Sequence, residues 1–129
     1  AIHAAGAKAA VSVKPRTAVG ALAPVLADLG MVLVMSVEPG FSGQSYIEGS
    51  EAKVTRITEM ARAVGASPLI QVDGGIGEVT APIVAAAGAD VLVCGNAVFA
   101  AEDPAAALAA VQAAAEEARL AALAVSKEA

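Results

Sequence analysis

Short runs of valine, isoleucine and leucine alternate along this chain with longer alanine-rich stretches. An apolar run bounded by turn residues is typical of a buried strand, whereas apolar positions three and four residues apart are typical of a helix. The pattern predicts strands at residues 9–14, 31–37, 69–73 and 90–94. It predicts helices at residues 17–29, 51–64 and 78–87, a short helix at 96–101 and a long one at about 103–125.

Capping residues support several of these boundaries. A glycine follows each of the first three predicted helices, at positions 30, 65 and 88, where a left-handed conformation commonly ends a helix. Thr17 is expected to cap the first helix, and Asp103 followed by Pro104 is expected to cap the last. Residues 126–129 are expected to fray.

Strands that alternate with helices are expected to be parallel and joined by right-handed crossovers. Such an α/β alternation fits an open doubly wound sheet, and it fits consecutive strands of a barrel equally well. At 129 residues the chain has room for one domain, which spans residues 1–129.

Composition excludes some classes of partner. The net charge of −5 argues against nucleic acid, which requires a basic surface. Hydrophobic residues make up 57% of the chain, but none of their runs has the length of a membrane span, so no membrane partner is expected. Cys94 is the single cysteine, which rules out a disulfide within the chain and favours a reducing, cytoplasmic location.

The last three predicted strands each end in glycine-rich sequence. Glycine at the carboxyl end of a parallel strand lets backbone N–H groups approach an anion, and barrels commonly bind phosphate with these loops and a short helix. Tight turns alone would also explain one such loop, but three at the same edge favour a phosphate site. The candidate residues are Gly40, Phe41, Ser42, Gly43, Gly74, Gly75, Gly95 and Asn96.

Asp73 ends the third apolar run and directly precedes two glycines. A carboxylate at this edge of a barrel is a candidate general acid or base, or a metal ligand. A turn or helix-capping role is the alternative.

Three segments, at residues 34–44, 72–76 and 87–95, resemble the ribulose-phosphate 3-epimerase family in order and spacing. The resemblance covers the whole chain and implies a (β/α)8 TIM barrel of which only the last four βα units, approximately strands 5 to 8, are present. The absence of an initiator methionine, and an opening that reads as the middle of a helix, lead us to expect the C-terminal half of such a barrel.

The resemblance implies an isomerase of the pentose phosphate pathway that interconverts D-ribulose 5-phosphate and D-xylulose 5-phosphate at C3. The family uses two carboxylates and a divalent metal cation, for which zinc, iron, manganese and cobalt are candidates. Asp73 resembles the aspartate that is both metal ligand and proton-transfer acid, and the glycines resemble those that hold the phosphate and sugar tail. Met35 resembles a methionine near the reacting carbon, although core filling explains it equally well.

The chain departs from the family pattern at two points. Asn96 stands where the family often has serine. The second aspartate and two metal-binding histidines belong to early strands outside this sequence, and His3, expected in an exposed or helix-packing position, does not replace them. Cys94 is expected to be an inert core thiol, and Lys53, like Lys14, to be solvated at the surface.

We therefore expect negligible epimerase activity from the chain alone, and homo-oligomers or association through open sheet edges. Two alternatives remain open. The chain could be a half-barrel that binds phosphate without turnover, or it could belong to an epimerase of another ketose phosphate, such as allulose 6-phosphate.

Overall fold

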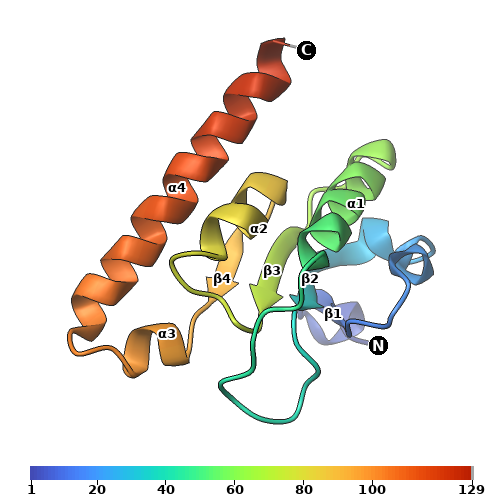
Figure 1. The fold of residues 1–129 in the computed structure, drawn as a ribbon. Helices are drawn as coiled ribbons and strands as arrows, with labels where there is room; N and C mark the ends of the chain where they lie inside the picture. Colours follow the sequence, from blue (N-terminus) through green and yellow to red (C-terminus); the bar gives the residue numbers. More distant parts are fainter. Residues whose placement is uncertain (129) are drawn as a thin grey trace.

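A computed structural model describes residues 1–128 and shows one parallel sheet with strand order β1-β2-β3-β4 (Figure 1). The strands are β1 (Ala9–Val13), β2 (Leu29–Met35), β3 (Leu69–Asp73) and β4 (Val91–Val93). The α-helices are α1 (Ser50–Ala63), α2 (Ala81–Ala87), α3 (Asn96–Phe99) and α4 (Pro104–Glu128), and short 3-10 helices are η1 (His3–Ala5), η2 (Val19–Leu22) and η3 (Leu26–Asp28). The predicted parallel βα alternation is confirmed.

One face of the sheet carries the hydrophobic core. Alternate strand residues point to it and form one cluster with buried side chains of α1, α2 and α4, of which α4 packs mainly on α2. The core strand residues are Val13, Val32, Val34, Ile70 and Val72. An open doubly wound sheet carries helices on both faces, so a single helical face with strands in sequential order favours consecutive strands of a barrel.

The opposite face of the sheet is only partly covered by the described residues. Strand pairing places Met35, Asp73 and Val93 in one row across it, with Leu33, Gln71 and Val91 in the next. Leu69, in a third row beside Met31, is 48% exposed. Parallel sheets are normally buried on both faces, so this face and the edge strands β1 and β4 fit the expectation of association, which stays a prediction.

The predicted helix at residues 17–29 is wrong. The segment forms η2 and η3 instead, and Gly30 lies inside β2 rather than ending a helix. Pro24 lacks an N–H, and its ring would collide with the preceding helical turn, so a continuous α-helix is disfavoured. Leu22 and Leu26 are nevertheless buried in the core, which explains why their spacing suggested a helix.

Two expectations near this segment are also wrong. Thr17 caps no helix, and its hydroxyl accepts a hydrogen bond from the Lys14 N–H at 3.2 Å. Lys53 is not a solvated surface lysine: its Nζ donates to the carbonyls of Lys14 at 2.9 Å and Thr17 at 2.7 Å, and also to that of Pro15. These carbonyls lie in an irregular loop, and the Lys53 ammonium on α1 provides donors for them.

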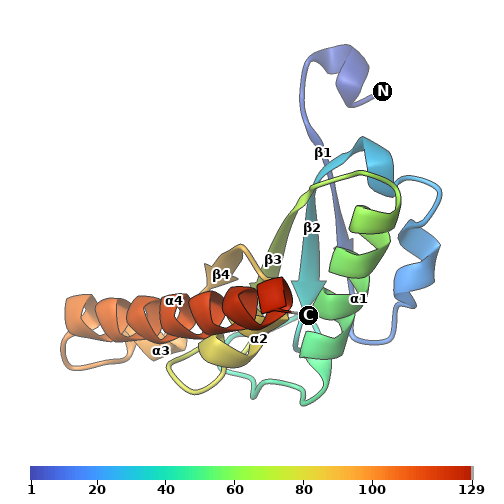
Figure 2. The same cartoon turned by 90° about the horizontal axis from the view of Figure 1, so that it is seen from above.

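Other boundaries differ by a few residues. Helix α2 begins at Ala81, three residues later than predicted. Helix α4 continues to Glu128 through residues 126–128 of the segment expected to fray, and residue 129 lies outside the described residues. The predicted cap of α4 is confirmed, since the Asp103 carboxylate accepts from the N–H groups of Ala105 and Ala106, both at 3.0 Å. Figure 2 shows α4 lying across α2. No helix in residues 1–128 is both long and apolar enough to cross a membrane.

Candidate functional site

A cavity of about 760 Å³ opens at the carboxyl ends of β2, β3 and β4. The loops that follow these strands form its walls, as expected where parallel strands end at one edge of a sheet. The structure brings every residue predicted for the site to this cavity, namely Met35, Gly40, Phe41, Ser42, Gly43, Asp73, Gly74, Gly75, Gly95 and Asn96. The binding role of each one stays a prediction.

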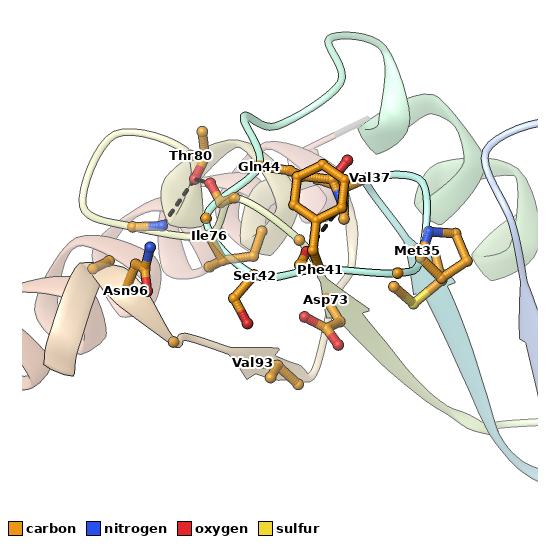
Figure 3. A pocket seen from close by; sticks show the side chains of 18 of the residues that line it. Met35, Val37, Phe41, Ser42, Gln44, Asp73, Ile76, Thr80, Val93 and Asn96 are labelled. Carbon is orange, nitrogen blue, oxygen red and sulfur yellow. Dashed lines mark hydrogen bonds between the residues drawn. The ribbon is translucent and has the colours of Figure 1, made fainter. Parts of the chain in front are cut away.

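Asp73 is the last residue of β3 and lies in the row between Met35 and Val93. This row belongs to the face opposite the hydrophobic core, so the half-buried Asp73 side chain points into the cavity rather than into the core (Figure 3). The thioether of Met35 lies on the neighbouring strand. The cavity therefore presents a carboxylate beside an apolar thioether.

The loop after β2 is held in shape by Gln44. Its Nε2 donates to the carbonyl of Glu38 at 2.6 Å and to that of Phe41 at 3.0 Å. The Phe41 ring, 76% exposed, lines the same cavity as Asp73 (Figure 3). Gly43 has φ +79°, and a Cβ there would lie 2.7 Å from Nδ2 of Asn96, so this glycine lets two loops meet. Sequence reasoning missed Gln44 because its partners are visible only in the folded loop.

Gly74 and Gly75 permit a second close contact between loops. With φ +127° at Gly74, a Cβ would lie 2.6 Å from Cγ2 of Val37. With φ +65° at Gly75, a Cβ would overlap the backbone nitrogen of Tyr46 and lie 2.7 Å from its Cα. A larger residue at Gly74 or Gly75 would clash with the neighbouring loop, so packing explains both glycines even without a bound anion. Gly95 differs, because nothing lies within 4 Å of its Cβ position.

Two hydroxyl groups at the cavity were not predicted for the site: Ser36 lies behind the lining, whereas Thr80 belongs to it. The fully buried Ser36 Oγ donates to the carbonyl of Gly74 at 2.6 Å. Thr80 Oγ1 donates to the carbonyl of Gly75 at 2.9 Å and accepts from the N–H of Gly77 at 3.0 Å (Figure 3). The sequence contains one sign that could have pointed to Ser36: it is a polar residue within an apolar run.

Tyr46 and Glu51 fasten the returning end of the loop to α1. The Tyr46 hydroxyl donates to Oε2 of Glu51 at 2.7 Å. Burial, followed by this hydrogen bond, raises the pKa of the Tyr46 phenol. The same bond is the largest cause that lowers the pKa of the Glu51 carboxyl from 4.5.

Replacing Tyr46 with phenylalanine is expected to reduce the free energy of unfolding at pH 7 by about 1 kcal/mol, because it removes a hydrogen bond to a charged but solvent-screened group. A carboxyl group whose pKa is lower in the folded state stabilises the fold at pH values above its unfolded pKa. This stabilisation is lost as the pH falls through the folded pKa. Urea unfolding of the wild type and the Tyr46→Phe protein at pH 7 and pH 3 measures the difference in their free energies of unfolding at each pH. If this difference were the same at the two pH values, the hydrogen bond from Tyr46 to the charged Glu51 carboxylate would not be its cause.

Cys94 and His3 lie outside the cavity lining. Cys94 packs partly buried against the core, and burial raises the pKa of its thiol, which agrees with an inert core thiol. His3 is exposed on η1, beside the amino ends of the strands and therefore at the opposite end of the sheet from Asp73.

The described residues do not assemble a complete metal site. They contain no group of three or more His, Cys, Asp and Glu side chains placed to hold a metal ion. Asp73 and the exposed Glu78 are the acidic residues that line the cavity. Asp73 is thus a possible single ligand, and the remaining ligands would have to come from other residues.

Comparison with known proteins identifies the family. Residues 1–99 match the ribulose-phosphate 3-epimerase family. The chain is 46% identical over 111 residues, 86% of its length, to ribulose-phosphate 3-epimerase of Mycobacterium tuberculosis (strain ATCC 25618 / H37Rv), of which this covers 48%. It is 44% identical over 108 residues, 84% of its length, to the chloroplastic ribulose-5-phosphate-3-epimerase of Arabidopsis thaliana, with 38% of that protein covered.

The chain thus spans about half the length of the curated relatives that it matches, or less. Its four parallel strands alternating with helices agree with part of a TIM barrel of that family. The identity over most of the chain, together with the family match to residues 1–99, shows that the chain belongs to the ribulose-phosphate 3-epimerase family.

Proposed function

We propose that this chain supplies the phosphate-binding loops and one proton-transfer carboxylate of an enzyme that interconverts D-ribulose 5-phosphate and D-xylulose 5-phosphate. One observation carries the proposal: the side chain of Asp73 shares a single cavity with the glycine-rich loops after β2, β3 and β4. The named activity of the relatives supports the choice of substrate.

The chemistry requires a group such as Asp73. C3 of the ketose is adjacent to the C2 carbonyl, so loss of its proton gives an enediolate. Inversion requires that one group removes the proton from one face of C3 and that another delivers a proton to the opposite face. The Asp73 carboxylate serves as one of these two groups. Its partner acid is a second carboxylate on the opposite side of the substrate.

The glycine-rich loops serve the phosphate end of the substrate. The N–H groups of Gly74 and Gly75 donate to no backbone carbonyl among the described residues. At the start of α3, the first N–H groups have no partner within the helix. Local dipoles hold the phosphate, so the net charge of −5 does not oppose binding.

Enzymes of this family use divalent metals. A bound divalent cation supplies charge stabilisation for the enediolate oxygens. Asp73 has the ligand chemistry for such an ion, but the described residues do not complete its coordination. The steps assigned to this chain are therefore proton transfer by Asp73 and phosphate binding by its loops.

Replacing Gly95 with aspartate is expected to weaken binding of D-ribulose 5-phosphate at least about tenfold, because a carboxylate at the cavity wall repels the phosphate. The change fits sterically, since the Cβ position at Gly95 is open. Isothermal titration of the sugar phosphate into both proteins measures the effect.

Gly20→Asp is the matched control, because Gly20 also has an open Cβ position, carries no positive φ and lies outside the cavity lining. This control adds the same charge and is expected to leave binding unchanged. Equal affinity of the Gly95→Asp protein and the wild type would show that the loops do not hold phosphate.

A further inference from the structure

Ser36 lies behind the cavity wall, directly after β2, and all its polar groups have partners. It is fully buried. Its N–H donates to the carbonyl of Asp73 at 2.9 Å, and its own carbonyl accepts from the N–H of Ile47 at 2.8 Å. Its hydroxyl lies 2.6 Å from the carbonyl of Gly74 and 3.0 Å from that of Asp73. Three separate segments of the chain therefore meet at this one residue.

The hydroxyl of Ser36 has one proton, so the two carbonyls share it, and the shorter contact identifies Gly74 as its main acceptor. The Asp73 carbonyl also receives the backbone N–H of Ser36. Both carbonyls consequently face Ser36. A buried carbonyl without a partner is costly, so this arrangement holds the turn after β3 against the end of β2.

The direction of these carbonyls determines the direction of two N–H groups. In a planar trans peptide, the C=O and N–H bonds point to opposite sides. Because the Asp73 and Gly74 carbonyls face Ser36, the N–H groups of Gly74 and Gly75 point away from it. Gly74 and Gly75 line the cavity, whereas Ser36 does not. The two N–H groups of these cavity-lining glycines thus point away from a residue that does not line the cavity.

We infer that Ser36 is a positioning residue for the phosphate, acting through the Asp73–Gly75 turn. Its hydroxyl and N–H hold two consecutive peptides so that the N–H groups of Gly74 and Gly75 donate to the phosphate together. This inference rests on the proposed phosphate site. Glycine peptides rotate easily because they lack a Cβ, so such a turn needs an external restraint to keep its donors aligned.

The test follows binding of inorganic phosphate to the ¹⁵N-labelled 129-residue chain by amide NMR. In the wild type, the amide signals of Gly74 and Gly75 are expected to shift with phosphate, together with those of Gly95 and Asn96. Ser36→Ala is expected to weaken phosphate binding about tenfold, as loss of one well-aligned donor would. Ser36→Thr retains the hydroxyl and is expected to restore most of the affinity.

Ser50→Ala is the matched control. Ser50 is also buried, its hydroxyl donates to the carbonyl of Ile47 at 2.6 Å, and it lies outside the cavity lining. Its replacement removes the same kind of bond and is expected to lower the melting temperature without changing phosphate affinity. If Ser36 had only a structural role, the Ser36→Ala and Ser50→Ala proteins would bind phosphate with the same affinity.

The outcomes separate this inference from the proposed function. If phosphate shifts the amides of Gly95 and Asn96 but not those of Gly74 and Gly75, the inference is wrong while the phosphate site stands. Wild-type affinity in the Ser36→Ala protein also overturns it. If phosphate shifts none of these four amides in the wild type, the proposed phosphate site itself is wrong, and the inference fails with it.

Discussion

The purified 129-residue chain is expected to epimerise D-ribulose 5-phosphate at least roughly 10²–10⁴-fold more slowly than a full-length relative, because Asp73 is one of the two proton-transfer groups that the proposed reaction needs. Residues 1–128 contain no group of three or more side chains placed to hold a metal ion, and this lowers the expected rate further. A coupled assay for D-xylulose 5-phosphate measures the rate. Readily measurable turnover by the chain alone would contradict the half-site assignment.

Joining the chain to the part of the Mycobacterium tuberculosis relative that it does not match is expected to restore turnover. In that joined protein, Asp73→Asn is expected to lower kcat by about 10²–10⁴-fold with little change in KM, since asparagine keeps the shape but cannot transfer the proton. Asp28→Asn is the control, because Asp28 is exposed at the amino ends of the strands. Full activity without Asp73 would remove it from the mechanism.

The same joined protein distinguishes the possible substrates. D-ribulose 5-phosphate and D-allulose 6-phosphate can be compared by kcat/KM under identical conditions. A higher value for the pentulose phosphate is expected from the named activity of the relatives. Preference for the hexulose phosphate would replace the proposed substrate while leaving the role of Asp73 intact.

Replacing Gly75 with alanine is expected to lower the free energy of unfolding by roughly 2–5 kcal/mol. Two effects add: a left-handed conformation costs about 1–2 kcal/mol with a Cβ, and forcing a methyl group into a packed region costs about 1–3 kcal/mol. At Gly75 both apply, since φ is +65° and the Cβ position overlaps the backbone of Tyr46. Urea unfolding of the joined protein, followed by circular dichroism, measures the loss.

Gly95→Ala separates the structural role of Gly75 from the general effect of losing a glycine. Gly95 has φ −97° and no atom within 4 Å of its Cβ position, so its replacement is expected to change stability by less than about 0.5 kcal/mol. Similar stability of the two alanine variants would show that the contact between the Gly75 turn and Tyr46 does not constrain the fold.

The sequence by itself determined the strands, their parallel direction and the edge of the sheet where the site lies. Apolar runs are local signals, and a strand–helix alternation forces successive strands to run the same way. The carboxyl ends of β2, β3 and β4 must then meet at one edge. The sequence therefore predicts that Asp73 lies together with the glycines of the loops that follow these strands.

A local pattern does not identify the secondary structure where an α-helix and an irregular segment would bury the same residues. Leu22 and Leu26 are spaced as on a helix, and both are buried, yet the backbone around Pro24 forms 3-10 turns instead. The Lys53 ammonium then meets carbonyls of that irregular segment nearly 40 residues away along the chain. A lysine on a predicted helix surface carries no local sign of such partners.

Only the tertiary structure decided which groups hold the site in shape. The Ser36 hydroxyl meets carbonyls 37 and 38 residues further along the chain, Gly75 packs against Tyr46, and Gly43 lies against Asn96. These contacts depend on the relative placement of three loops, which is set by packing across the sheet. Spacing along one strand or helix contains no information about them, because hydrogen bonds and steric contacts between loops form only after the strands have paired.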